Sequence, residues 1–412
     1  MSSDRENTPF LEVALDNLSA GKAVERLVRQ AWEADASDLY INWNENDVSV
    51  AMRCLGRLRH LTTVSHTDGS RMVNYVKTAA GMDLAQKLRP LDGRWVREID
   101  NGVKLDLRIN TIPTLYGEDM AIHLLRRNFG LMQLDNLGLH RKDLAELRSQ
   151  LFSGSGLILV TGPTGAGKTT TLYASLHALN DGSRKINTIE DPVEYVLAGV
   201  RQSQVSPKIG LDFPELLRSV LRQVPDVIMV GEVRDPVTAQ TTVRAANSGH
   251  LVLATLHAPT SSGAIDSMLA LGVHPHFLAN SVQIILAQRL VRTLCDNCKI
   301  PFDVRDAPEV FDDIRSWLKP GQGEVAYAPS MCDQCHYEGY TGRTGVFEML
   351  RVMPEIRSLV AKRKPAREIR EMAIHQGMLD FRRSALLKVA YGITSLEEVV
   401  REIPVEYLLP PD

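Results

Sequence analysis

The chain has 412 residues, of which 44% are hydrophobic and 24% charged, the ordinary balance of a water-soluble protein with two or three domains. Its 47 basic and 50 acidic residues give a net charge of −3, which argues against a protein that binds nucleic acid or an anionic membrane through bulk positive charge. Its five cysteines are too few and too clustered for a disulfide scaffold.

The beginning of the chain carries no recognisable targeting signal. Residues 1–9 lack the charged segment and apolar core of a secretory signal. No apolar run in the sequence approaches the roughly 18 residues that a membrane-spanning helix needs. We therefore expect a cytoplasmic protein whose membrane association, if it has one, goes only through partners.

The first part of the chain predicts a mixed α+β domain. Residues 1–20 are polar and are expected to be disordered. Apolar residues recur at helical spacing over 22–35, which predicts a helix. The short β-like runs that follow are 39–43, 48–53 and 104–112. We expect this domain to span 21–128, with a linker near 126–130.

The middle of the chain alternates apolar strands with helical stretches. A predicted helix at 144–151 leads into it. The strand candidates are 157–161, 186–190, 227–231 and 251–256. Strands that read as continuous apolar runs between helices indicate a mainly parallel sheet covered by helices on both faces. We expect this α/β domain to span 129–290.

A complete G-x-x-x-x-G-K-[ST] phosphate-binding loop follows the first of these strands. Its residues are Gly162, Pro163, Thr164, Gly165, Ala166, Gly167, Lys168, Thr169 and Thr170. The motif binds an anion as a strand-to-helix turn, where free backbone N–H groups face the ligand, and the preceding apolar run supplies that context. Lys168 is expected at the terminal phosphates of a nucleotide and the Thr169 hydroxyl on Mg²⁺. A plain glycine-rich turn is the competing interpretation.

Acidic residues follow two of the later strands. Glu190 and Asp191 end the run at 186–190, and Glu232 follows the run at 227–231. Ligands of such sheets bind at the carboxyl ends of parallel strands, so these carboxylates are candidates for water activation and Mg²⁺ binding. Acids at strand ends are also common without a function. Their position beside a phosphate-binding loop makes them a coherent set.

Four of the cysteines form two C-x-x-C pairs, Cys295 with Cys298 and Cys332 with Cys335, separated by 33 residues. Four thiolates at this spacing fit a tetrahedral Zn²⁺ ion, because each pair can chelate through a tight turn. Unligated buried thiols or redox-active thiols are the alternative. The surrounding segment, 291–345, is small and rich in Cys, Pro, Gly and Asp, and we expect it to need a cross-link such as a bound metal to be stable.

The last part of the chain, 346–412, predicts a helical C-terminal domain. Thr394 and Glu397 have the spacing of a capping box that would open its final helix. The basic run at 362–367 is a candidate docking or nucleic-acid patch, with the solvated start of a helix as the simpler interpretation.

Taken together, these motifs resemble those of the secretion ATPases, and within them the type II secretion and type IV pilus-assembly branch. The segments that carry the resemblance are Gly-Pro-Thr-Gly-Ala-Gly-Lys-Thr-Thr-Thr-Leu-Tyr at 162–173, Ile-Glu-Asp-Pro-Val-Glu-Tyr at 189–195, Arg-Gln-Val-Pro-Asp-Val-Ile-Met-Val-Gly-Glu-Val-Arg-Asp at 222–235, and Ser-Gly-His-Leu-Val-Leu-Ala-Thr-Leu-His at 248–257. The resemblance implies a RecA-like P-loop ATPase core, a PAS-like N-terminal domain, ATP and Mg²⁺ as ligands, and a homohexamer.

The resemblance also implies catalytic roles. Glu190 corresponds to the glutamate that positions and activates the attacking water. Glu232 matches the acid of an atypical Walker B motif, which helps to hold Mg²⁺ and water. His250 and His257 match a histidine box thought to sense the nucleotide and couple it to the subunit boundary. A satisfied core or surface histidine is the alternative for each.

Arginines should complete such a site, because the negative charge of the γ-phosphoryl oxygens needs fixed cations. Arg94 and Arg108 in the N-terminal domain resemble the trans-acting arginines of the family. Arg218, Arg222 and Arg234 match family arginines near the Walker B strand, which implies a place at the subunit interface. A solvated surface charge is the alternative for each arginine.

The cysteine flanks are similar to those of the secretion and pilus-extension ATPases, whereas retraction motors usually lack the cysteines. The chain departs from the family pattern at four places. Val224 stands where aspartate is common, His123 where arginine is usual, and Tyr40-Ile-Asn-Trp43 replaces a His-x-Glu-Pro-like pattern. After His257 the usual Thr-Asn-Asp reads Ala-Pro-Thr. These departures indicate a divergent member.

The function implied by the resemblance is that of a hexameric ATPase motor for pseudopilus or pilus subunit assembly. It would lie in the cytoplasm, held at the inner face of the cell membrane by a platform protein, with no direct contact to nucleic acid. Two alternatives stay open: a DNA-uptake or DNA-handling motor of related fold, and a nucleotide-gated scaffold with little turnover. The presence of Glu190 and Glu232 speaks against the scaffold, and the absence of a basic, aromatic-rich stretch speaks against the DNA motor.

Overall fold

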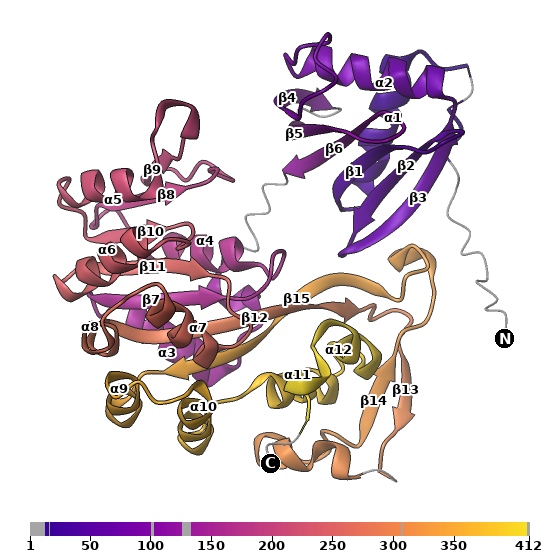
Figure 1. The fold of residues 1–412 in the computed structure, drawn as a ribbon. Coiled ribbons are helices and arrows are strands. Elements are labelled where there is room, and N and C mark those ends of the chain that lie inside the picture. The colour runs from indigo at the N-terminus through magenta and orange to yellow at the C-terminus, as the bar shows by residue number, and fades with distance from the viewer. Residues whose placement is uncertain (1–12, 16, 100–102, 126–132, 306–307, 410–412) are drawn as a thin grey trace. The chain divides into compact units, whose positions relative to one another are not determined.

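The computed structural model describes residues 13–15, 17–99, 103–125, 133–305 and 308–409 (Figure 1). The chain divides into two compact units, Met1–Arg127 and Asn128–Asp412. The linker predicted at 126–130 lies outside the described residues, as do residues 1–12 of the predicted disordered N-terminus.

The first unit is a six-stranded antiparallel sheet with two helices. Its strands, in their order across the sheet, are β3 (Arg57–Val64), β2 (Val48–Cys54), β1 (Ala36–Trp43), β6 (Glu118–Leu125), β5 (Val103–Pro113) and β4 (Leu91–Ile99). Its helices are α1 (Ala20–Glu33) and α2 (His66–Ala79). The predicted helix corresponds to α1, and the predicted strands lie in β1, β2 and β5. The sequence patterns do not predict α2, β3, β4 or β6.

The helices of the first unit cover one face of its sheet. Leu27 of α1 is buried in the same cluster as Leu39, Leu107 and Ile122, which come from β1, β5 and β6. Because successive side chains of a strand point to opposite faces, the residues between these apolar positions lie on the other face. That other face is polar, and Tyr40 is one of its residues.

The sheet of the second unit has seven strands. In their order across the sheet they are β15 (Tyr340–Arg351), β12 (Val282–Leu294), β7 (Gly156–Thr161), β11 (Leu251–Leu256), β10 (Val227–Val230), β8 (Ile186–Glu190) and β9 (Arg201–Gln204). Neighbours from β12 to β9 are parallel, and β15 runs antiparallel to β12 at the edge. Every residue of β7 and β11 is buried. The predicted parallel sheet is confirmed.

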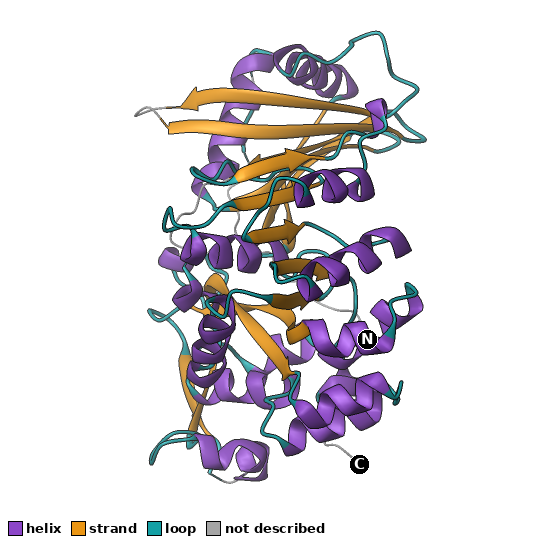
Figure 2. Ribbon diagram, turned by 90° about the vertical axis from the view of Figure 1, so that its left-hand side faces the viewer, coloured by secondary structure: helices purple, strands orange, loops and turns teal. Residues whose placement is uncertain are grey.

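Helices cover both faces of this second sheet (Figure 2). On one face, α3 (Arg141–Leu151) and α4 (Lys168–Leu179) pack against Ile158 and Val160 of β7. The helices of the other face are α5 (Phe213–Leu221), α6 (Pro236–Asn247), α7 (Ser261–Ala270), α8 (Pro275–Ser281), α9 (Pro354–Ala361) and α10 (Ala366–His375). Since both faces are covered, polar groups of this sheet reach solvent mainly at its edges.

The cysteine segment connects two strands of this sheet. The predicted range 291–345 begins inside β12 and ends inside β15, which pair with each other along their length. A two-stranded sheet of β13 (Ile300–Asp303) and β14 (Val325–Ala328) lies between them in sequence. Two further helices, α11 (Phe381–Ala390) and α12 (Leu396–Glu402), share a buried cluster with β12, β14 and β15.

The predicted capping box is wrong by one residue. The N-cap of α12 is Ser395, whose Oγ accepts the backbone N–H of Glu398 at 3.1 Å. Thr394 instead donates its hydroxyl to the carbonyl oxygen of Arg292 at 2.7 Å. The Glu398 carboxylate accepts from the buried Arg292 guanidinium at 2.7 and 3.0 Å. Ser395 and Glu398 have the same spacing as Thr394 and Glu397, and the helix begins at this second pair.

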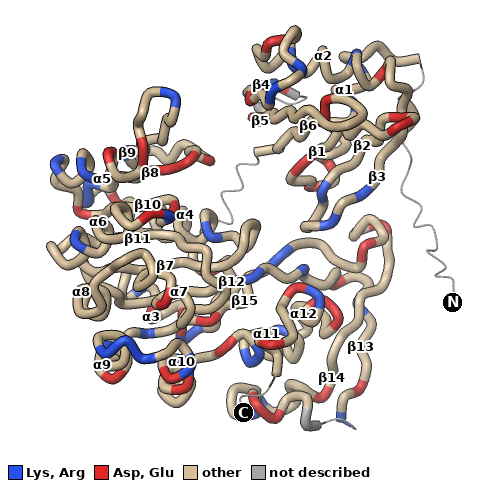
Figure 3. The backbone as a smooth tube through the Cα atoms, in the orientation of Figure 1, with Lys and Arg blue, Asp and Glu red and all other residues tan. Residues whose placement is uncertain are grey.

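In the described part of the chain, none of the helices has the length and apolar character that crossing a membrane would require. Basic and acidic residues are interspersed over both units (Figure 3), in keeping with the small net charge.

Candidate functional site

The phosphate-binding loop forms the expected turn between β7 and α4. Gly162 and Gly167 have φ values of 146° and 86°, in the region that residues with a Cβ rarely adopt. At Gly162 a Cβ would also come within 2.5 Å of the carbonyl oxygen of Gln288. Gly167 is the N-cap of α4, so the free N–H groups of this helix end lie at the loop. Such an arrangement suits the phosphates of a nucleotide.

Gln288 of β12 holds the loop in place through two side-chain hydrogen bonds. The sequence analysis did not identify this residue. Its Nε2 donates to the carbonyl oxygen of Ala166 at 2.6 Å, and its Oε1 accepts from the Thr171 hydroxyl at 2.8 Å. Gln288 is only 1% exposed. The signal that could have found it is an amide side chain that directly follows the apolar run 284–287 of β12.

Lys168 lies over the loop and is the first residue of α4. Its Nζ donates to the carbonyl oxygens of Gly162 at 2.8 Å and Pro163 at 3.0 Å. Burial lowers the pKa of Lys168, Arg289 acts in the same direction, and the Glu232 carboxylate opposes both. Phosphate oxygens are stronger acceptors for an ammonium group than carbonyl oxygens, so a bound nucleotide would draw this side chain to itself.

Parallel pairing brings the two predicted glutamates to the edge that carries the loop. Ile189, Val230 and Ala254 are aligned across β8, β10 and β11, and Leu256 of β11 is aligned with Thr161 of β7. The residues that follow these positions therefore share one edge of the sheet. They include Glu190, Glu232 and His257.

Glu190 ends β8 and is 3% exposed. Its Oε2 accepts from the Tyr173 hydroxyl at 2.5 Å. Its Oε1 accepts from the Thr188 hydroxyl at 2.6 Å and from Nε2 of Gln202 at 3.1 Å. Both oxygens of this buried carboxylate therefore have hydrogen-bond donors.

Glu232 is held by two basic side chains. Its Oε2 lies 2.5 Å from Nη2 of Arg234, and its Oε1 lies 2.8 Å from Nε2 of His257. Burial acts to raise the pKa of Glu232, but Arg234, His257 and Lys168 outweigh it and hold that pKa below its ordinary range. The structure thus groups Lys168, Glu232, Arg234 and His257 at one edge. Together with the Thr169 hydroxyl, Glu232 supplies oxygen donors of the kind that Mg²⁺ prefers.

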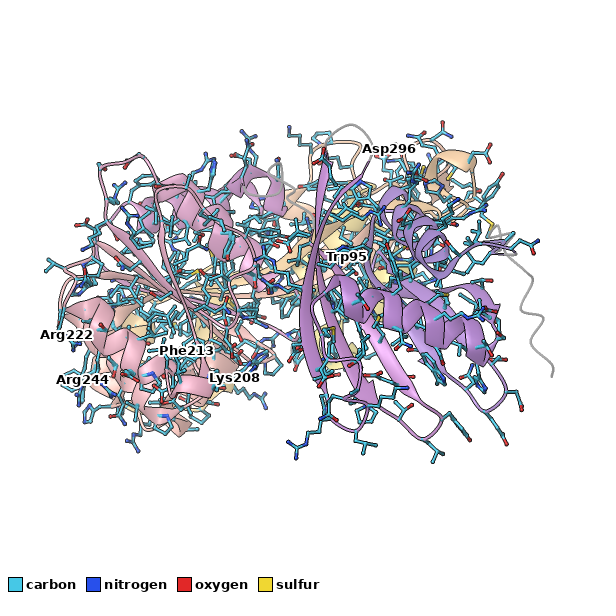
Figure 4. The ribbon with its side chains drawn as sticks, turned by 90° about the horizontal axis from the view of Figure 1, so that it is seen from above. Trp95, Lys208, Phe213, Arg222, Arg244 and Asp296 are labelled. Carbon is cyan, nitrogen blue, oxygen red and sulfur yellow. The ribbon has the colours of Figure 1, made fainter. Side chains whose placement is uncertain are left out.

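Other predicted residues lie away from this edge. His250 immediately precedes β11, at the opposite end of that strand, and its Nδ1 contacts the carbonyl oxygen of Ala245 at 3.0 Å. Arg218 of α5 and Arg222 at its C-cap are exposed, and Arg222 points outward at the periphery of the unit (Figure 4). Val224 follows them with a φ of 51° and is 80% exposed. Within one chain these residues do not meet the phosphate-binding loop.

The two arginines predicted in the N-terminal domain lie on the polar face of the first unit's sheet. Arg94 of β4 and Arg108 of β5 are directly opposite in register, and Arg108 is in turn opposite His123 of β6. Arg94 donates to the carboxylate of Asp106 at 2.6 and 2.8 Å, and this contact raises its pKa. His123 contacts the carboxylate of Asp38 through Nδ1. The sheet thus presents a row of charged groups on an open face.

The four predicted cysteines meet at one point. Their Sγ atoms all lie within 4.8 Å of one another, and the pairs Cys295–Cys332, Cys298–Cys335 and Cys332–Cys335 are 3.7 to 3.8 Å apart. A Zn²⁺ ion with four sulfurs at about 2.3 Å would place neighbouring sulfurs about 3.8 Å apart. N–H donors reach two of the sulfurs, from Asn297 to Cys332 at 3.3 Å and from Gly339 to Cys335 at 3.2 Å. Donor type, count and spacing therefore fit zinc.

Comparisons with known proteins agree with these observations. The family model described as "Type II/IV secretion system protein" matches residues 14–401. The chain is 38% identical over 380 residues to type II secretion system protein E of Dickeya dadantii, covering 92% of this chain and 75% of that protein. It is also 38% identical over 386 residues to the type IV pilus assembly ATPase PilB of Thermus thermophilus, covering 94% of this chain and 43% of that protein. The chain thus spans less than half the length of the Thermus relative.

Solved structures share the fold. The ATPase DotB of Legionella pneumophila has a TM-score of 0.66 at 21% identity, over 91% of this chain and 93% of that chain. The pilus retraction motor PilT, solved with ADP, has a TM-score of 0.61 at 24% identity, over 92% of this chain and 96% of that chain. The family match over nearly the whole sequence and the curated relatives lead to one conclusion: this chain belongs to the type II/IV secretion system protein family.

Proposed function

We propose that this chain hydrolyses ATP as the motor of a type II secretion or type IV pilus-assembly machine. The observation that carries the proposal is the shared sheet edge, where Glu190 ends β8 and Glu232 follows β10 at the same ends of the strands as the phosphate-binding loop with Lys168. The names of the curated relatives, a type II secretion protein E and a type IV pilus assembly ATPase, support the same class of machine.

The residues at this edge would each have a different role in ATP hydrolysis. Backbone N–H groups of the loop and Lys168 would bind the ATP phosphates. Thr169 and Glu232 would hold Mg²⁺, which supplies positive charge against the phosphate oxygens when bound. Glu190 would orient the attacking water and accept its proton. Arg234 and His257, which hold Glu232, would fix the direction of that carboxylate.

Positive charge from the first unit would complete the site. Arg94 and Arg108 would stabilise the charge on the γ-phosphoryl group of a nucleotide bound by the same or a neighbouring subunit. Such a dependence favours a ring, and we propose a homohexamer with Arg218, Arg222 and His250 near its subunit boundaries. Cytoplasmic rings of this kind would act at the inner face of the cell membrane through a platform protein.

The cysteine cluster would hold one structural Zn²⁺ ion. Cys295, Cys298, Cys332 and Cys335 would be its ligands, and N–H groups of Asn297 and Gly339 donate to two of the sulfurs. A bound ion would supply bond energy to fix the turns between β12 and β15.

A comparison of three proteins in steady-state ATPase and nucleotide-binding assays tests the proposal. The wild-type chain should hydrolyse ATP, Lys168→Ala should lose binding or turnover, and Glu190→Gln should keep binding but lose turnover by about 100-fold or more. Lys208→Ala, at an exposed lysine, is the control and should match the wild type. A wild-type chain that binds ATP without turnover would support a nucleotide-gated scaffold instead. A Glu190→Gln variant with wild-type turnover would contradict the role of Glu190.

A further inference from the structure

The carboxylate of Glu190 is surrounded by donors from three different elements. Tyr173 comes from α4, Thr188 from β8 itself and Gln202 from the neighbouring strand β9. Tyr173 is 1% exposed and makes the shortest of the contacts, 2.5 Å to Oε2. It lies five positions after Lys168 on α4, so one helix carries both the phosphate-binding lysine and the hydroxyl that holds the glutamate.

The Tyr173 hydroxyl has its proton directed toward Glu190. Its oxygen accepts backbone N–H groups of Glu194 at 3.3 Å and Tyr195 at 3.5 Å. With those N–H groups as donors to the phenolic oxygen, the carboxylate is the acceptor left for the O–H. Burial and the nearby Glu190 raise the pKa of Tyr173, so the phenol stays protonated and remains a donor.

Gln202 is fixed by the backbone of the segment that follows β8. Its Oε1 accepts the N–H of Leu197 at 2.8 Å, and its Nε2 donates to the carbonyl oxygen of Tyr195 at 2.8 Å. The same Nε2 lies 3.1 Å from Oε1 of Glu190. Because both ends of the amide are engaged, its orientation is determined and its second N–H can serve the carboxylate.

We propose that Tyr173 and Gln202 are positioning residues that hold the Glu190 carboxylate in a single orientation for ATP hydrolysis. The inference rests on the proposed function, because it takes Glu190 as the group that activates water. Donors from α4 and β9 also place the carboxylate relative to the phosphate-binding loop, since α4 begins at that loop.

Tyr173→Phe removes only the hydroxyl and keeps the ring, which packs edge-on against Tyr195 at 5.9 Å. We expect kcat for ATP to fall about tenfold or more, because a hydrogen bond to a charged group is lost, while KM and the nucleotide dissociation constant stay within about twofold. Gln202→Leu, which keeps a similar volume, should lower kcat about threefold or more.

The control is Ser175→Ala on the same helix. Ser175 is 3% exposed and donates to the carbonyl oxygen of Thr171 at 2.8 Å, so this variant also removes a buried hydroxyl without a contact to Glu190. It should lower the melting temperature about as much as Tyr173→Phe and leave kcat unchanged. If Tyr173→Phe does not fold, the kcat of Gln202→Leu decides the question.

The inference is overturned if the folded Tyr173 or Gln202 variants keep wild-type kcat, turn over faster, or lose no more kcat than Ser175→Ala. These outcomes are separate from a failure of the proposed function. Glu190→Gln with wild-type turnover would contradict the proposed function itself. Inactive Glu190→Gln together with an unaffected Tyr173→Phe would contradict only the positioning role.

Discussion

The two sheets of this protein leave room for chemistry in different places. The seven-stranded parallel sheet is covered by helices on both faces, and every residue of β7 and β11 is buried. Its functional groups gather at the edge where the strands end. The six-stranded antiparallel sheet packs its two helices on one face, and Arg94, Arg108 and His123 form a row across the other. The seven-stranded sheet therefore places its polar residues at the ends of its strands, whereas the six-stranded sheet places them on one of its faces.

This difference affects how a residue can be replaced. At the carboxyl ends of the parallel strands, the backbone of the phosphate-binding loop lies so close to other backbone atoms that one added side-chain atom can prevent the site from forming. On the open face, exposed side chains such as that of Arg94 contact one another rather than the backbone, so we expect them to be exchanged at little cost to the fold. The following predictions test this contrast, beginning with the largest expected effect.

Gly162→Ala should abolish tight ATP binding. A Cβ there would lie 2.5 Å from the Gln288 carbonyl oxygen at a φ of 146°, so the loop must shift. We expect a loss of affinity of about 100-fold, equivalent to about 3 kcal/mol. Gly154→Ala is the control, because Gly154 also has a positive φ of 86° but has no atom within 4 Å of an added Cβ. That variant should lose stability and keep its affinity, and equal affinities for the two variants would refute the role of close approach.

Replacement of one cysteine should release the predicted zinc ion. The wild-type chain, purified without chelator, should contain about one Zn²⁺ per chain, and Cys332→Ser should contain almost none. In Cys332→Ser, proteolysis between β12 and β15 should become fast while the seven-stranded sheet stays folded. Cys54→Ala removes a buried thiol of the first unit and should keep the metal. Wild-type protein with far less than one equivalent would exclude a zinc site.

Asp143 should make the covered sheet less stable at neutral pH. It lies on α3, and burial raises its pKa to about 6, against the opposing effect of Arg351 and Lys142. A carboxyl group that holds its proton more tightly in the folded state contributes stability below its ordinary pKa of 3.8 and loses that contribution as the pH rises through about 6. The free energy of unfolding of Asp143→Asn should therefore be about 1–2 kcal/mol higher than that of the wild type at pH 7, and the two should be equal below pH 4. Denaturant titrations at both pH values check this, and a pH-independent difference would contradict it.

We expect the smallest of these effects at Val224, which lies just before the start of β10 in the seven-stranded sheet. A β-branched residue with a φ of 51° is strained, and its side chain is 80% exposed. Val224→Gly should raise the free energy of unfolding by about 1 kcal/mol. Val237→Gly, inside α6, is the control and should lower it by a similar amount. A loss of stability in both variants would show that the Val224 conformation carries no strain.

The contrast between the sheets also explains what could be predicted from the sequence. Strands β7, β8, β10 and β11 are buried on both faces, so they are visible as continuous apolar runs. The strands β3, β4 and β6 have one polar face, and their mixed composition does not stand out.

Local motifs predicted the phosphate-binding loop and the cysteine cluster because the residues that define them are close in sequence. Partners that are distant in sequence could not be predicted. Gln288 braces the loop from 122 residues away from Ala166. The ion pair between Arg292 and Glu398 joins β12 to α12 across a separation of 106 residues. Such contacts depend on the register of the whole sheet, which no local pattern contains.

The central claim is that turnover needs both the edge of one sheet and the open face of the other. Mixing Lys168→Ala subunits with Arg108→Ala subunits in verified hexamers tests it most directly, because each variant supplies the group that the other lacks. If Arg108 acts on a nucleotide held by a neighbouring subunit, some boundaries in the mixture carry both groups. ATPase activity should then rise well above that of either variant alone. Activity that stays at the sum of the two inactive parents would contradict the claim that the two sheets of different subunits act together.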